Sequence, residues 1–208
     1  MELDLHQRVL VMKPAKTDFA RTTNSHMARS KAYKTRLVRG HGWRAQPNHK
    51  ILVLGRGAAR LEIPETWVVE MSDDCVKVFD KNPPDDDCIL AVSYHHWPAI
   101  GQNLSVASLV RSALEGDERC FVTIDPIVEE TKIDIALAWA QGTFIDPRTN
   151  GEACARLCIA RKAQIQALLT FDFWLSDFAS CDSQWRMFLA TLQLGQWVAD
   201  PLRGPSVS

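Results

Sequence analysis

The chain has 208 residues, of which 46% are hydrophobic and 24% are charged, and its formal net charge at pH 7 is −1. This length and composition suit one globular domain with an extension, and a domain of about 150 residues buries enough surface to need neither disulfides nor a structural metal. No apolar run approaches the roughly 18 residues of a membrane-spanning helix, so we expect no membrane span.

The first fifty residues differ from the rest in charge. They contain eleven Lys and Arg against three acidic residues, which gives +8 and leaves −9 for the remainder. The segment is rich in Ser, Thr, Arg and Lys and lacks a sustained hydrophobic period, which favours a disordered extension. We therefore divide the chain into a basic N-terminal extension (1–49), a folded domain (50–197) and a C-terminal tail (198–208).

Three roles are open for the basic extension. It could be a solvated leader without a function of its own, a surface that attracts nucleic acid or another anionic partner, or a targeting peptide. A further alternative is that translation begins at Met27 and not at Met1. The aromatic residues of this segment, Phe19, Tyr33 and Trp43, are too scattered to form a platform for stacked bases, which weighs against nucleic acid.

Six cysteines are spread through the chain. An even number would suit a disulfide framework in a small secreted protein, but the short apolar run Val9–Met12 is followed at once by Lys13 and Pro14, so no secretory segment is visible. We expect a reduced, cytoplasmic protein whose cysteines act mainly as small core residues. Cys154 and Cys158, four residues apart on one predicted strand, are separated by about 13 Å and cannot form a disulfide.

Regular structure is expected from residue 50 onward, where the run KILVLGRGAARLEIP combines two strands with a glycine turn. Gly55 and Gly57 match the first two positions of a dinucleotide-binding fingerprint, but Arg60 stands at the third position. Pro64 then leaves no room for the helix whose N-terminus would hold the phosphates. The glycines therefore predict a turn with positive φ angles and not a nucleotide site.

A proline corner comes next in the chain. Pro64 cannot donate a hydrogen bond within a sheet, so it marks the end of a strand, and an extended run resumes at Thr66–Val69 with Trp67 as a core anchor. The segments CVKVFD and CILAVSYHHW continue an antiparallel meander. We expect the strands on both sides of Pro64 to share a single sheet with the later strands.

A helix is predicted over residues 105–116, where apolar residues recur at helical spacing. Ser105 suits its N-cap, and Gly116 suits its C-terminal end. The strand that follows alternates large and small side chains. Its large residues, which should share one face, are Ile133, Ile135, Leu137 and Trp139. The alanines between them should let the helix pack closely on the other face.

The last third of the domain contains a hairpin and a closing helix. Asn150-Gly151 favours positive φ angles and predicts a hairpin between two long strands. A helix is expected over residues 182–194, where an apolar stripe is formed by Trp185, Phe188, Leu189 and Leu192. Together, the elements predict an α+β fold in which helices flank an antiparallel β-sheet as an α/β/α sandwich.

The order of these elements resembles the PsbP-like superfamily. The shared features are a corner formed by Ile63, Pro64 and Trp67, the meander, one helix, a long hairpin and a closing amphipathic helix, together covering residues 50–195. The superfamily includes the extrinsic photosystem II protein, a Ran-GTPase-binding nuclear import factor and small bacterial domains of unknown function, to which this chain looks nearest. The resemblance implies a non-enzymatic binding or assembly module, and it carries over no partner-binding residue.

The main hypothesis for function is a module that binds another protein. Aromatic residues often dominate the affinity of protein interfaces, so Trp97, Trp174 and Trp197 are the candidate anchors. The alternative for each of them is ordinary packing in the core.

The alternative hypothesis is a small hydrolase-like or metal-dependent enzyme, which would combine His95 or His96 with a carboxylate from a neighbouring strand, either Glu129, Glu130 or Glu152. His95 and His96 are adjacent, so they point to opposite faces of a strand and cannot readily bind one ion together. The sequence has no G-x-S-x-G, H-E-x-x-H or P-loop motif. On the main hypothesis we expect no catalytic residue, no metal and no cofactor.

Overall fold

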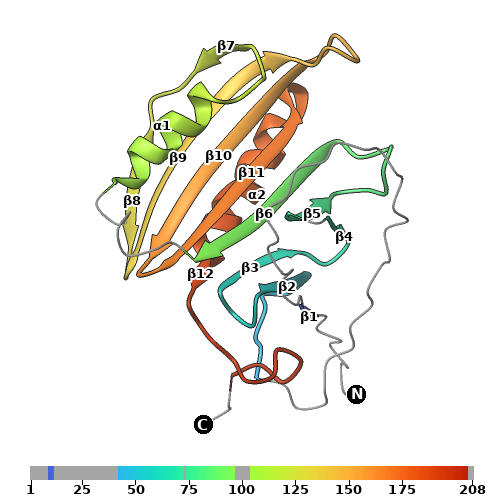
Figure 1. Ribbon diagram of the computed structural model, residues 1–208. Helices are drawn as coiled ribbons and strands as arrows, with labels where there is room; N and C mark the ends of the chain where they lie inside the picture. Colours follow the sequence, from blue (N-terminus) through green and yellow to red (C-terminus); the bar gives the residue numbers. More distant parts are fainter. Residues whose placement is uncertain (1–8, 12–41, 73, 97–103, 206–208) are drawn as a thin grey trace, which may run out of the picture.

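The computed structural model of the protein describes residues 9–11, 42–72, 74–96 and 104–205, and Figure 1 shows their arrangement. A large antiparallel sheet forms the centre. Helix α1 (Val106–Glu115) lies on one face of this sheet, and helix α2 (Phe178–Thr191) lies on the other together with a small second sheet. These layers confirm the predicted α+β sandwich.

The large sheet has eight strands in the order β4-β5-β6-β11-β10-β9-β7, and the eighth strand, β8, also pairs with β9. The strands are β4 (Val68–Met71), β5 (Val76–Phe79), β6 (Cys88–His96), β7 (Phe121–Ile124), β8 (Val128–Lys132), β9 (Ile135–Ile145), β10 (Glu152–Lys162) and β11 (Ile165–Trp174). The predicted hairpin joins β9 to β10, and Asn150 in its turn has a φ of 56°. The long antiparallel hairpin is therefore confirmed.

The small sheet has the order β1-β2-β3-β12. Its strands are β1 (Val9–Val11), β2 (His49–Leu54), β3 (Ala59–Pro64) and β12 (Gln193–Leu194). Strand β1 runs parallel to β2, and the other pairs are antiparallel. Because β3 ends at Pro64 in the small sheet while β4 belongs to the large sheet, the prediction that the strands on both sides of Pro64 share one sheet is wrong.

The proline corner carries the chain from the small sheet to the large one. The backbone N–H of Trp67 donates to the carbonyl of Pro64 (3.2 Å), and the ammonium group of Lys50 donates to two carbonyl oxygens of the corner. The buried Trp67 ring packs against Phe171 and Phe188, with ring centroids 6.2 and 5.7 Å away. Trp67 is thus a core anchor, as predicted, and it lies where the two sheets and α2 meet.

Helix α1 covers β9 and β10. The hydroxyl of Ser105 accepts the backbone N–H of Ser108 (3.0 Å) as the predicted N-cap, and the helix ends at Gly116. The fully buried Ala138 and Ala140 lie in the same cluster as the inner residues of the helix. Small side chains on the sheet allow a close approach of the helix, as the alanine row predicts.

The sequence pattern predicts that Ile133 shares one strand face with Ile135, Leu137 and Trp139, but Ile133 is not part of the strand. It occupies a two-residue turn between β8 and β9, where Lys132 pairs with Ile135, and it has a φ of 55° and is 95% exposed. A positive φ is unfavourable for a β-branched residue. The alternation of apolar residues does not show where a strand gives way to a turn, so the pattern extended the strand too far.

Helix α2 closes the other face of the large sheet. It begins at Phe178, before the predicted start at residue 182, because the 3-10 turn η2 (Leu175–Asp177) leads directly into it. The predicted apolar stripe is buried, and Phe171 on β11 stacks on Trp185 with ring centroids 6.2 Å apart. Among the residues described here, neither α-helix is long and apolar enough to cross a membrane.

Arg156 on β10 lies beneath α2 with a side-chain exposure of only 1%. Its Nη2 is 2.9 Å from Oδ1 of Asp182 on the helix, and its Nε donates to the amide oxygen of Gln141 (2.7 Å). Four rings surround the guanidinium at 5.2–6.0 Å, those of Trp139, Phe173, Phe178 and Trp185. Burial raises the pKa of Asp182, but hydrogen bonds from Arg186 and Arg156 outweigh it, so the pKa is lowered overall.

Trp43 packs on the outer face of the small sheet, although the sequence analysis places it in the N-terminal extension. Its ring is buried with Ile51 and Val53, and its indole N–H donates to the carbonyl of Pro201 (2.7 Å). A Cβ added to Gly204 would lie 2.8 Å from this ring. Residues before position 49 and after position 197 therefore also pack on the domain, outside the boundaries that the sequence predicts.

Replacing Arg156 with alanine should lower the free energy of unfolding by about 3 kcal/mol, because it leaves a cavity among four rings and removes a partner of Asp182. Chemical denaturation measures this change. Arg186→Ala is the matched control, since Arg186 also pairs with Asp182 (2.8 Å) but is 79% exposed and should contribute less than about 1 kcal/mol. Equal effects of the two substitutions would contradict the structural role of Arg156.

Replacing Trp43 with alanine should lower the free energy of unfolding by about 3–5 kcal/mol, because the substitution empties a buried site and leaves the Pro201 carbonyl without its donor. The same denaturation measurement applies. Trp197→Ala, at a tryptophan that is 56% exposed, should change stability by about 1 kcal/mol or less. If Trp43→Ala were as mild as this control, residues 42–48 would not be an integral part of the domain.

Candidate functional site at one end of the large sheet

The candidate residues lie at two opposite ends of the large sheet. On β11, Gln166 is opposite His95, and Trp174 follows eight residues later, which corresponds to about 26 Å along a strand. His95 and Trp197 lie at one end of the sheet, and Trp174 and Glu152 lie at the other.

At the first end, Tyr94, His96 and Trp197 form an aromatic group that we call the Trp197 surface. The imidazole of His96 stacks on the indole of Trp197 with centroids 5.8 Å apart and an angle of 6° between the planes. The ring of Tyr94 meets His96 edge-on at 6.1 Å, and burial raises the pKa of its hydroxyl. Two residues that sequence reasoning assigned to different hypotheses, His96 and Trp197, are thus in contact.

The turn between β2 and β3 holds the backbone on both sides of Trp197. The N–H of Gly195 donates to the carbonyl of Ala58, and the N–H of Val198 donates to the carbonyl of Arg56, each at 3.0 Å. These bonds continue the pairing of β12 with β3 beyond the end of the strand. The indole is therefore presented from a backbone that is fixed on the domain.

Gly55 and Gly57 allow this close approach. Gly55 has a φ of 53°, and a Cβ added there would lie 2.1 Å from the hydroxyl of Tyr94. Gly57 has a φ of 99°, and a Cβ added there would lie 1.8 Å from the carbonyl oxygen of Gln196. The predicted turn with positive φ angles is confirmed, and its glycines make room for the Trp197 surface.

A hollow of about 260 Å³ adjoins the Trp197 surface, with the residue before Trp197 in its wall. The charged groups in this hollow have partners: Lys162 pairs with Asp134 (2.6 Å), and Lys132 donates to carbonyl oxygens at the C-terminal end of α2. The exposed Ile133 also lines it. This end of the molecule therefore presents two large exposed apolar side chains beside a hollow whose charged groups already have partners within the protein.

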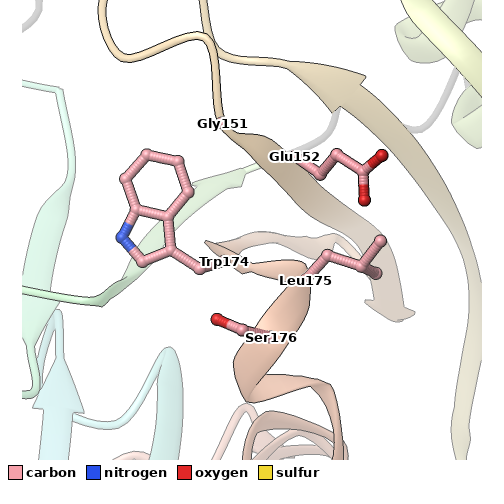
Figure 2. A pocket seen from close by; sticks show the side chains of 5 residues that line it. All are labelled: Gly151, Glu152, Trp174, Leu175 and Ser176. Carbon is pink, nitrogen blue, oxygen red and sulfur yellow. The ribbon is translucent and has the colours of Figure 1, made fainter.

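The opposite end has an open hollow of about 530 Å³, shown in Figure 2. Its lining residues are Gly151, Glu152, Trp174, Leu175 and Ser176. The indole of Trp174 and the carboxylate of Glu152 point away from each other in Figure 2. A Cβ added to Gly151 would lie 3.1 Å from the Trp174 ring, so this ring packs against the turn of the hairpin. The two predicted residues share a hollow but do not converge on one point.

The residues of the alternative enzyme site are not brought together. His95 and His96 end β6, whereas Glu152 begins β10 at the other end of the sheet. Glu130 lies on β8, four strands from β6 or about 19 Å away, where its carboxylate accepts the indole N–H of Trp139 at 3.4 Å. Within the described part of the chain, no three His, Cys, Asp or Glu side chains gather closely enough to hold a metal ion.

Sequence reasoning missed two residues of this end of the molecule. Tyr94 precedes His96 by two residues and must share its face, so strand alternation could have found it. Ile133 carries no such signal, because its exposure follows from a turn that the apolar pattern conceals. Trp97, the third predicted anchor, lies outside the described residues.

The chain matches the model of one protein family, Alr1449, over residues 50–198. A relative from Nostoc sp. (strain PCC 7120), named "Uncharacterized protein alr1449", is 32% identical over 166 residues, which cover 79% of this chain and 86% of the relative.

Solved structures also resemble this chain. The cyanobacterial PsbP protein (CyanoP) of Synechocystis sp. PCC 6803 matches with a TM-score of 0.52 and 10% identity, over 73% of this chain and 95% of that one. The Ran-binding protein Mog1p of Saccharomyces cerevisiae matches with a TM-score of 0.47 and 8% identity, over 71% and 95% of the two chains. The likeness to CyanoP bears on the fold, and it confirms the PsbP-like fold predicted from the sequence.

Replacing Gly57 with alanine should detach the segment that carries Trp197, because the added Cβ meets a backbone carbonyl at a positive φ. We expect a loss of about 1–3 kcal/mol in the free energy of unfolding and faster hydrogen exchange at the Val198 amide. Gly116→Ala is the matched control, since Gly116 has a φ of −90° and its added Cβ finds no atom closer than 3.5 Å. If hydrogen exchange at the Val198 amide were unchanged in Gly57→Ala, the turn between β2 and β3 would not be what holds the backbone around Trp197.

Proposed function

The chain belongs to the Alr1449 family, and we propose that its domain is a non-enzymatic module that binds another protein through the Trp197 surface. One observation carries the proposal. Trp197 is 56% exposed, yet its indole is stacked on His96 and the backbone on both sides of it is held by hydrogen bonds to the turn between β2 and β3. An exposed aromatic side chain in a fixed position is suited to recognition.

The energetics of association favour such an anchor. A tryptophan offers a large apolar area together with one N–H donor, and tryptophan is enriched among residues that dominate interface affinity. A side chain that is already held in place loses little conformational entropy when a partner covers it. The stack on His96 therefore prepares Trp197 for contact at a low entropic cost.

The neighbourhood of Trp197 indicates the character of the contact. Ile133, 95% exposed, offers a second apolar side chain, and the adjoining hollow offers a recess. Lys162 and Asp134 already neutralise each other in that hollow. We infer that the partner contributes apolar side chains to the centre of the interface, with polar groups around them.

The proposal also covers the location of the protein in the cell and the role of its basic extension. We place the protein in the cytoplasm, and we give the basic extension (residues 1–49) a separate role, the attraction of an anionic surface such as nucleic acid.

The test begins with a photo-crosslinking amino acid placed at position 197 of the full-length protein in its native cell, and separately at position 174. The position-197 protein should yield a defined adduct with a partner. Binding of that purified partner is then measured by calorimetry. Trp197→Ala should weaken binding by about tenfold or more, since loss of an interface anchor raises Kd by this order, and His96→Ala should weaken it less.

Trp174→Ala is the matched control, because it removes the same side chain from the opposite end of the sheet. Its Kd should stay within about twofold of the unaltered protein, a change well below 1 kcal/mol. Should Trp174→Ala weaken binding while Trp197→Ala leaves it intact, the docking surface would lie at the other end and the proposal would fail.

A further inference from the structure

Arg56 stands at the tip of the turn between β2 and β3 in a backbone conformation that is unfavourable for its side chain. Its φ is 57°, and its neighbours Gly55 and Gly57 have φ angles of 53° and 99°. Glycine adopts such angles freely, whereas a residue with a Cβ is strained there, because the Cβ comes too close to a backbone carbonyl oxygen. The turn therefore holds an arginine where glycine would be relaxed.

The Arg56 side chain makes no polar contact with the part of the fold that the structure describes. It is exposed, and it has no hydrogen-bond or ion-pair partner among the described residues. The carbonyl of Arg56 does accept the N–H of Val198 at 3.0 Å, but any residue at this position could offer a carbonyl. Strained residues of this kind are concentrated at functional sites. The observation points to a ligand of the guanidinium that the domain itself does not supply.

The same turn places Arg56 at the border of the Trp197 surface. A Cβ added to Gly55 would lie 2.1 Å from the hydroxyl of Tyr94, and a Cβ added to Gly57 would lie 3.3 Å from the backbone nitrogen of Trp197. Arg56 is the residue between these two glycines. A guanidinium carried from this position therefore adjoins the rings that we propose as the docking surface.

The charges at this end of the molecule favour an acidic partner. The hollow beside the Trp197 surface is lined by Lys132, Lys162 and Asp134, and Lys162 pairs with Asp134 at 2.6 Å. Lys132 donates to carbonyl oxygens at the C-terminal end of α2. Of these cations and Arg56, only Arg56 has no partner within the described chain. Its charge is therefore left for a ligand.

The opposite end of the large sheet has the reverse charge. The turn between β5 and β6 reaches that end, because Cys88 at the start of β6 lies opposite Phe173. This turn, the β9–β10 hairpin and η2 contain two basic residues, Lys81 and Arg148. An acidic partner is therefore repelled from that end and attracted to the Trp197 surface. The acidic residues of the same segments are Asp80, Asp85, Asp86, Asp87, Asp146, Glu152 and Asp177.

We propose that the partner of the Trp197 surface presents an acidic protein segment, in which a carboxylate side chain adjoins an apolar side chain. The carboxylate pairs with the guanidinium of Arg56, and the apolar side chain packs on Trp197 and enters the hollow beside it. The inference rests on the proposed function and adds the chemistry of the partner. An arginine suits this role because its fork of N–H groups binds both oxygens of a carboxylate.

A nucleic acid matches this end of the molecule less well. Its backbone presents a phosphate at every nucleotide, and proteins that bind it follow the backbone with a row of free cations. Arg56 alone of the cations named above lacks a partner in the described residues, and Ile133, which lines the hollow, is 95% exposed. One carboxylate flanked by apolar side chains is the better complement to this arrangement.

The first measurement identifies what the partner presents. The full-length protein with a photo-crosslinking amino acid at position 197 is irradiated in its native cell, and the adduct is digested and sequenced by mass spectrometry. The crosslinked residue of the partner should lie within a few positions of an Asp or Glu. A crosslinked peptide without acidic residues, or an adduct with nucleic acid, overturns the inference. The absence of any adduct overturns both this inference and the proposed function.

The second measurement uses the purified partner and the variant Arg56→Gly. Its Kd should rise about tenfold, since close charge pairs at interfaces contribute at least this much. Its melting temperature should stay equal or rise, because glycine relieves the backbone strain, whereas loss of a structural residue would lower it. Raising the salt concentration from about 0.05 to 0.5 M should weaken binding of the unaltered protein more than binding of Arg56→Gly.

Two further variants complete the test. Arg56→Lys keeps the charge but not the fork, so its Kd should lie between those of the unaltered protein and Arg56→Gly. Arg148→Gly removes an arginine that is 86% exposed at the acidic end, and its Kd should stay within about twofold of the unaltered protein. If Trp197→Ala weakens binding and Arg56→Gly does not, the inference is overturned while the proposed function stands.

Discussion

Arg156 places a permanent positive charge between the large sheet and helix α2, and the position of that helix depends on how this charge is accommodated. Removing a guanidinium from water is costly unless partners replace the solvent. Asp182 and Gln141 supply two of these partners, and four aromatic rings surround the group. The first half of α2 is thereby fixed over β10, because only there does the helix bring its carboxylate to the buried charge.

The position of α2 in turn determines what happens at both of its ends. At its start, the helix buries Cys181 in the same core cluster as Cys88 of β6. At its end, Lys132 from β8 donates to the last carbonyl oxygens, and the chain continues into β12, which pairs with β3 and leads to Trp197. The buried core at the start of α2 and the exposed aromatic surface beyond its end therefore depend on the same helix.

The two faces of the large sheet pack against their helices with side chains of different size. Under α1 the sheet presents alanines such as Ala138 and Ala140, and the helix approaches closely. Under α2 it presents aromatic rings, and the larger space between the layers holds Trp67, Phe171 and Trp185. This layer buries five aromatic residues, Trp67, Phe171, Phe173, Trp185 and Phe188, whereas Trp197 is 56% exposed and therefore stands out as a tryptophan that the core does not require.

Local features of the fold were accessible from the sequence. Ser105, Gly116 and the Asn150-Gly151 turn act through neighbours a few residues away, and strand and helix periodicity depends only on backbone geometry. The resemblance to PsbP-like proteins rested on the order of such elements, and for this reason it correctly predicted the layers. The apolar alternation failed at Ile133, where the chain turns with a positive φ that periodicity does not report.

The sequence could identify single residues of the candidate site but not the contacts between them. Trp197 and His96 could each be named as functional residues, but 101 positions separate them in the chain, and no local rule says that their rings stack. The same holds for Trp43, whose indole donates to the distant carbonyl of Pro201. By itself the sequence determined which elements form and which side chains must be buried, because these follow from short-range geometry and hydrophobicity. Only the tertiary structure decided which distant residues meet, because that depends on how all the layers pack at once.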